Sequence, residues 1–160
     1  MSVTIYVEGW DQNCEIVKYY LKDLYPDLDD SYFEHDPFVK KEESTGLLFE
    51  ERSESSYPDF SMTNGSMAIT LDFIGRKNIM FDDEDGTGSV PQKNISKFLA
   101  DVCKARNSIE KSNLDKENKV ITEGNLTTMN VSQGRMSFYL DQIMHLLHFA
   151  NKKGVGIYWA

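Results

Sequence analysis

Two histidines and an aspartate lie close together near the C-terminal end of the chain. His145 and His148 are three residues apart, and Asp141 precedes His145 by four. On a helix this spacing places the side chains at neighbouring positions, where they could share a metal ion. The sequence has no His-Glu-x-x-His motif and only one further histidine, His35. A metal site at Asp141, His145 and His148 is therefore the weaker alternative, because histidines beside a packed helix face are commoner than ligands.

Two cysteines, Cys14 and Cys103, are the only thiols. A catalytic thiol needs a base that takes its proton, so either cysteine would have to meet His35 or His145 in the folded chain. Both cysteines fall in segments with helical periodicity, where a free thiol behaves as a small apolar side chain. We expect packing thiols and a reducing compartment. A small metal-dependent or thiol enzyme is the alternative to a non-enzymatic protein.

A run of carboxylates from Asp82 to Asp85 precedes Gly86 and resembles a calcium loop. If Gly86 filled the invariant sixth position, the first and twelfth ligand positions would fall on Phe81 and Gln92, which carry no carboxylate. The same carboxylates would repel a phosphate at the glycines that follow. The run therefore predicts an exposed turn, and we expect no cofactor.

Carboxylates alternate with aromatic rings in residues 27–36. Aromatic side chains supply contact area with little rotamer entropy to lose, and surrounding carboxylates steer and select a basic partner. The alternative is a solvated loop whose rings cover the domain's own core. The residues that we expect to contact a partner are Asp29, Asp30, Tyr32, Phe33, Glu34 and Asp36.

The negative charge is concentrated in the first part of the chain. Residues 1–60 hold 15 acidic and 5 basic side chains, whereas residues 61–160 hold 11 acidic and 12 basic ones, and the total is −9. Nucleic acids and anionic membranes are disfavoured, because binding them requires a basic stripe that displaces counterions. A basic protein surface is the expected partner.

The N-terminal residues 1–6 lack a basic region followed by an apolar one, and no stretch approaches the length of an apolar membrane span. We therefore expect a cytoplasmic protein. With 160 residues, of which 40% are hydrophobic, one core and one domain over residues 1–160 are expected, with an acidic connecting stretch at about 26–45.

Period-two alternation predicts a strand over residues 2–8. Helical spacing predicts a helix over 11–25, ended by Pro26, and a short strand over 46–49 precedes a polar hairpin or loop at 50–56. The apolar positions on which the predicted helix rests are Cys14, Val17, Leu21 and Leu24.

Residues 61–75 fit both a strand and a helix, and a cap at Ser61 or Thr63 together with Gly75 favours the helix. A further helix is expected after Pro91. Residues 106–119 have the composition of a polar connection, and weak alternation over 120–131 indicates a possible strand.

The closing segment, residues 135–160, combines an amphipathic helix, an exit turn at Gly154 and Gly156, and a buried last strand at 157–159. The fold class predicted from these elements is α/β or α+β, a single small domain with a short sheet including strands near both termini and two to four packed helices. Parallel pairing of the terminal strands would make the helices crossovers. The function predicted is a non-enzymatic, acidic protein–protein interaction module, such as an inhibitor or immunity-type neutraliser of a basic protein.

Overall fold

The computed structural model describes residues 1–160, apart from the side chains of Leu126 and Thr128. The chain forms two compact units. The body comprises Met1–Gly9 and Tyr57–Ala160, and the inserted unit comprises Trp10–Ser56. The expected single domain over residues 1–160 stays a prediction, because two compact units can still unfold as one.

The body contains a five-stranded sheet in the order β5-β1-β10-β7-β6. All neighbouring strands of this sheet are antiparallel. Parallel pairing of the terminal strands is therefore wrong, and the mixed fold is of the α+β kind. The sequence pattern could not decide whether the terminal strands are parallel or antiparallel, because their relative direction depends on the path of the chain between them. The strands are β1 (Ser2–Val7), β5 (Asp59–Thr63), β6 (Met80–Phe81), β7 (Gly88–Val90) and β10 (Ile157–Trp159).

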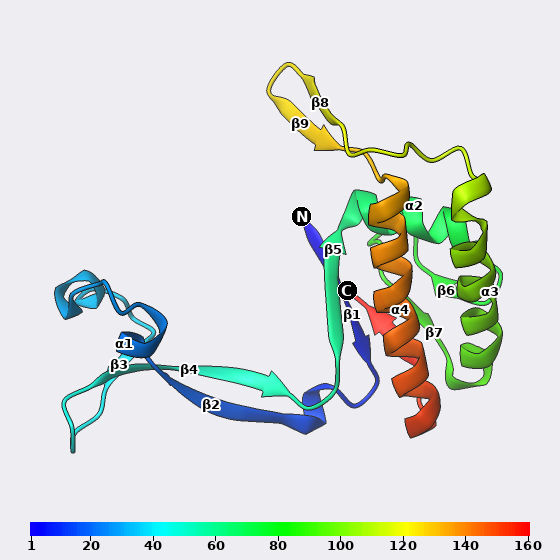
Figure 1. The fold of residues 1–160 in the computed structure, drawn as a ribbon. Helices are drawn as coiled ribbons and strands as arrows, with labels where there is room; N and C mark the ends of the chain where they lie inside the picture. The colour runs from blue at the N-terminus through cyan, green and yellow to red at the C-terminus, as the bar shows by residue number, and fades with distance from the viewer. The chain divides into compact units, whose positions relative to one another are not determined.

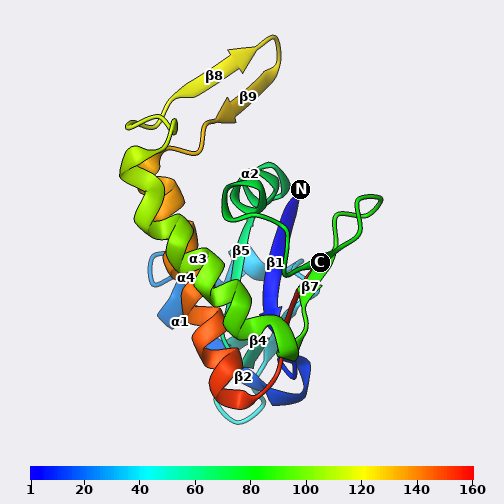
Figure 2. The same ribbon diagram turned by 90° about the vertical axis from the view of Figure 1, so that its right-hand side faces the viewer.

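Helices α2 (Asn64–Ile74), α3 (Ile95–Ser108) and α4 (Gln133–Lys153) lie over one face of this sheet (Figures 1 and 2). Strand β1 turns its odd-numbered residues, Val3 to Val7, toward the helices and buries them, as its period-two pattern predicts. Ile157 and Trp159 of β10 are buried as well. The predicted strands near both termini are confirmed.

The helix ends follow from local chemistry. The Thr63 hydroxyl accepts a hydrogen bond from the Ser66 amide at 3.1 Å, and α2 ends at Gly75 with φ of 96°, so the helix predicted in residues 61–75 is confirmed after a short strand. Ser132 caps α4 in the same way, and Gly154 ends it in the left-handed conformation. Short 3-10 turns, Gln92–Asn94 and Ile109–Lys111, flank α3. The predicted helix after Pro91 is confirmed.

Trp159 closes the core over a glycine. A Cβ atom on Gly88 would lie 2.1 Å from Trp159 Cζ2, so the indole occupies the space that any other side chain would need. Phe81, on the strand beyond, has its ring centroid 6.5 Å from that of the indole.

A second, two-stranded sheet in the body joins β8 (Val120–Glu123) to β9 (Leu126–Met129) as an antiparallel hairpin. The hairpin turns at Gly124, whose φ is 62°. The strand indicated at 120–131 is thus present. Among the described helices of the chain, none combines the length and the hydropathy that crossing a membrane requires.

The inserted unit is a three-stranded antiparallel sheet in the order β2-β4-β3, with a one-turn helix, α1 (Leu21–Leu24). Its strands are β2 (Cys14–Tyr20), β3 (Val39–Lys41) and β4 (Leu48–Ser55), and its 3-10 turns are Asp11–Asn13 and Asp30–Phe33 (η2).

The helix predicted over 11–25 is wrong, because most of that segment is strand β2, paired with β4 along its whole length. β-branched and aromatic residues dominate the strand and favour it over a helix. The polar run at 50–56, predicted as hairpin or loop, is largely strand β4. Most of its side chains are exposed, so burial imposed no alternation on the sequence.

Candidate functional site

The residues predicted to bind a partner lie in the inserted unit, within the segment 26–38, which we call the acidic segment. Two side-chain hydrogen bonds between residues two apart order its backbone. Asp29 accepts from the Ser31 amide at 3.3 Å, and Asp36 accepts from the Phe38 amide at 2.9 Å. Both bonds are of the Asx-turn kind, which orders a turn without burying it. The carboxylates stay exposed, and η2 presents the residues between them.

Two aromatic rings of the acidic segment project into solvent. Tyr32 is 72% exposed and Phe38 is 79% exposed. Phe33 is half-buried, and its ring centroid lies 5.3 Å from that of Tyr32 and 5.7 Å from that of Tyr25. Phe33 thus packs between two neighbouring rings, whereas Tyr32 projects into solvent, and the contact of either with a partner stays a prediction.

The prediction missed two exposed apolar side chains of the same unit. Phe38 follows Asp36 and Pro37 directly, and its position at the end of an acidic turn could have marked it. Ile16, on β2, is 74% exposed. The sequence did not single out Ile16, because its segment was predicted as a helix and Ile16 was not among the apolar positions of that helix.

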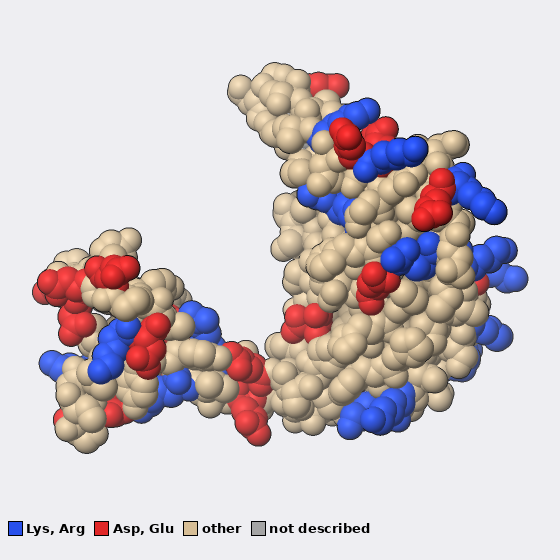
Figure 3. All heavy atoms as spheres, in the orientation of Figure 1, with Lys and Arg blue, Asp and Glu red and all other residues tan. Residues whose placement is uncertain are grey.

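The charge imbalance of the sequence falls almost wholly on the inserted unit. This unit carries 13 acidic and 5 basic residues, a balance of −8, and the body carries 13 acidic and 12 basic ones, a balance of −1. Figure 3 shows acidic side chains at both ends of this unit, one group over the part that contains η2 and one over the ends of the long strands, with basic side chains mainly between them.

The cations of the inserted unit are largely used within its sheet. Lys18 pairs with Glu42 at 2.8 Å, Lys40 pairs with Glu51 at 2.9 Å, and Arg52 pairs with Glu50. Among the described side chains, the carboxylates of the acidic segment make no ion pair. The field of the acidic segment is therefore not neutralised by neighbours.

Glu42 is the most strongly perturbed carboxylate of the inserted unit. It accepts hydrogen bonds from Lys18 at 2.8 Å, Tyr20 at 2.7 Å and Thr45 at 2.7 Å. These bonds favour the charged form and lower the pKa of Glu42 from 4.5 to about 2. In return, Glu42 raises the pKa of Lys18, whose ammonium lies 4.1 Å from the Phe49 ring centroid. This cluster joins β2 to the turn between β3 and β4.

The weaker alternative placed a metal at Asp141, His145 and His148. All three side chains are exposed on α4, and Asp141 accepts a hydrogen bond from Arg106 at 2.9 Å. Within the part of the chain that the structure describes, no three His, Cys, Asp or Glu side chains are grouped so that they could hold a metal ion. The metal site stays a prediction.

The two thiols have no imidazole among their recorded hydrogen-bond partners. Cys14 donates to the Trp10 carbonyl at 3.4 Å, and Cys103 lies 3.6 Å from the Met144 sulfur. Both are half-buried and unpaired as disulfides. The packing role expected for both thiols stays a prediction.

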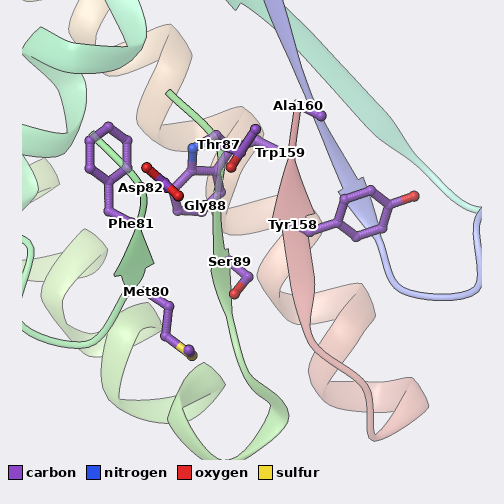
Figure 4. A pocket seen from close by; sticks show the side chains of 9 residues that line it. All are labelled: Met80, Phe81, Asp82, Thr87, Gly88, Ser89, Tyr158, Trp159 and Ala160. Atoms are coloured by element: carbon purple, nitrogen blue, oxygen red, sulfur yellow. The ribbon is translucent and has the colours of Figure 1, made fainter. Parts of the chain in front are cut away.

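A cavity of about 510 Å³ lies at the β6, β7 and β10 side of the body sheet. Figure 4 shows Met80, Ser89 and Tyr158, which oppose one another across these strands, around its mouth. Its one carboxylate, Asp82, accepts a hydrogen bond from the Glu84 amide at 2.9 Å. No imidazole or thiol is among the described lining residues. The indole nitrogen of Trp159 is buried without a described hydrogen-bond partner.

No protein-family model, curated protein or solved structure matches this chain.

Proposed function

We propose that this protein is a non-enzymatic interaction module that binds a protein with a basic surface through the acidic segment of its inserted unit. An inhibitor or immunity-type neutraliser acting in the cytoplasm fits this role. The observation that carries the proposal is the combination of solvated carboxylates without ion pairs and two largely exposed aromatic rings on one short segment.

The aromatic rings and the carboxylates of the acidic segment would contribute to binding in different ways. Burying Tyr32 and Phe38 against a partner would remove them from water, at roughly 1.5–3 kcal/mol for a large apolar side chain. The carboxylates around them would speed encounter with a positive surface and reject negative ones. The turn bonds at Asp29 and Asp36 reduce the backbone entropy lost on binding.

The negative charge of the inserted unit also favours some classes of partner over others. Two copies would each bring a unit with a balance of −8, so self-association through this surface is opposed. Nucleic acids and anionic membranes would be repelled for the same reason. A basic protein is the partner that this surface favours.

The test begins with affinity capture from the source cell, which we expect to recover a basic protein. Association with that protein is then measured by surface plasmon resonance for the unmodified chain and for a variant with Asp29, Asp30, Glu34 and Asp36 replaced by Lys. Steering by charge predicts that the variant associates at least ~10-fold more slowly and that binding of the unmodified chain weakens as salt rises.

A matched control replaces four exposed carboxylates of the body by Lys, which changes the net charge equally. These are Glu84, Glu110, Glu117 and Glu123. We expect the control to associate within ~2-fold of the unmodified chain, because its four substitutions change the net charge equally and leave the acidic segment intact. Equal slowing by both variants, or no effect of the first, would reject the acidic segment as the binding surface.

A further inference from the structure

A second cavity of the body, of about 750 Å³, has features that the interaction role does not use. Its walls come from the start of α2, the start of α4 and the β8–β9 hairpin. Cavities of this size hold small organic ligands in other proteins. The segments that meet here are far apart in the sequence and belong to one compact unit.

The apolar part of the lining is exposed. Ile69, Ile121 and Met129 are all among the exposed large hydrophobic residues of the described chain, and all three line this cavity. They come from three different elements, α2, β8 and β9. Their convergence on one cavity differs from scattered surface apolar residues, which need no explanation.

Three hydroxyl groups of the lining are hydrogen-bonded to one another. The Thr63 hydroxyl contacts the Ser66 hydroxyl at 2.9 Å, and Tyr139 donates to the same Ser66 oxygen at 3.3 Å. Ser66 is buried. The three groups form a fixed polar floor, and none of them faces a base that would make it a nucleophile.

Arg135 has the one charged side chain among the described lining residues, which also include Met1 at the N-terminus. It is half-buried, and its Nη2 atom lies 3.7 Å from the Met129 sulfur. The other arginines of the chain each pair with a carboxylate: Arg52 with Glu50, Arg76 with Asp72 and Arg106 with Asp141. No described carboxylate pairs with Arg135, so its guanidinium keeps its donors for another acceptor.

We propose that this cavity binds a small organic carboxylate with an apolar tail. A guanidinium presents parallel donors that match a planar carboxylate. The guanidinium of Arg135 would hold the carboxylate, and the tail would lie against Ile69, Ile121 and Met129. This inference does not depend on the acidic segment or on the proposed protein partner.

The test is calorimetric titration of the full chain with decanoate, and with decanol as the uncharged analogue of equal chain length. We expect one decanoate per chain, and binding of decanol weaker by at least ~10-fold, because a hydrogen-bonded charge pair is lost. Arg135→Met keeps much of the apolar stem and should weaken decanoate binding by a similar factor. Ile121→Ser should weaken both ligands.

The matched control is Lys104→Met, which removes one positive charge from an exposed position on α3 and should leave decanoate binding unchanged. If Arg135→Met fails to fold, Arg135→Lys serves in its place, and a loss of several-fold is expected because the fork geometry is gone. No decanoate binding, equal binding of decanol, or a loss as large in Lys104→Met as in the Arg135 variant would overturn the proposal.

Discussion

Different interactions stabilise the body and the inserted unit, each within itself. Of the 23 buried hydrophobic residues whose side chains the structure describes, only Leu21 and Phe49 belong to the inserted unit, and the rest belong to the body. The body therefore depends on apolar burial. The inserted unit depends on its backbone ladder and on ion pairs at its surface, which are individually weak. The contrast teaches that the unit with the smaller core also holds the two most exposed aromatic rings among the described residues, those of Tyr32 and Phe38.

The largest effect on stability is expected in the body. Leu140 is fully buried on α4, and Leu140→Ala should lower the free energy of unfolding by about 2–5 kcal/mol through lost burial and a cavity. Denaturant titration measures this loss. The control Ile16→Ala, at an exposed position, should change stability by no more than ~0.5 kcal/mol.

Hydrogen exchange on Leu140→Ala also tests the expected single domain. If the amides of β2 and β4 lose protection together with those of the body, residues 1–160 unfold as one domain. If β2 and β4 keep their protection while the body loses it, that expectation is wrong and the two units are independent.

In the inserted unit we expect a smaller loss of stability, which appears only at acidic pH. The pKa of Glu42 in the folded chain, about 2, lies below its ordinary value of 4.5. A depressed carboxyl pKa stabilises the fold above the unfolded-state value, and this contribution is lost as pH falls from about 4.5 toward about 2. Glu42→Gln should remove this pH dependence, with Tyr20 NMR signals as the measurement.

Glu43→Gln is the matched control for the Glu42 variant, because Glu43 is the exposed neighbour in the same turn. It should leave the acid transition of the Tyr20 signals where it is in the unmodified chain. A transition that moves equally in both variants would contradict the assigned role of Glu42.

The smallest effect on stability should accompany a large effect on binding. Tyr32→Ala and Phe38→Ala remove exposed rings, so each should change the free energy of unfolding by no more than ~0.5 kcal/mol. Each should raise the dissociation rate of a basic protein partner, with about 2 kcal/mol of affinity lost if the ring is an anchor. Met80→Ala, at an exposed apolar position of the body, should leave the dissociation rate unchanged.

Sequence alone predicted those elements in which burial imposes a pattern. The helix ending at Gly154 and the strand holding Trp159 carry apolar periodicity, cap residues and a left-handed glycine, all of which agree with the structure. Strand β2 escaped prediction because neither of its faces is well buried, so Cys14 and Val17 produced a helical spacing by chance. Its neighbour β4 is polar for the same reason.

The candidate sites divide along the same line. Composition and charge were enough to single out the acidic segment, since it is one continuous stretch of sequence. The cavity at Arg135 was beyond prediction, because it unites Ile69, Ile121 and Arg135 from segments whose meeting depends on the fold. The unpaired state of Arg135 could be recognised only once the partners of the other arginines were known.

Strands β1 and β5 are neighbours in the sheet, with Tyr6 opposite Asp59 at the end from which the chain leaves and to which it returns. In topology, the inserted unit therefore takes the place of an ordinary hairpin turn between two adjacent strands. A short turn in place of Trp10–Ser56 would remove no strand of the body sheet. Each strand would keep the neighbours that it has in that sheet. A protein built this way could gain, lose or exchange the inserted unit without a change to the sheet that carries it.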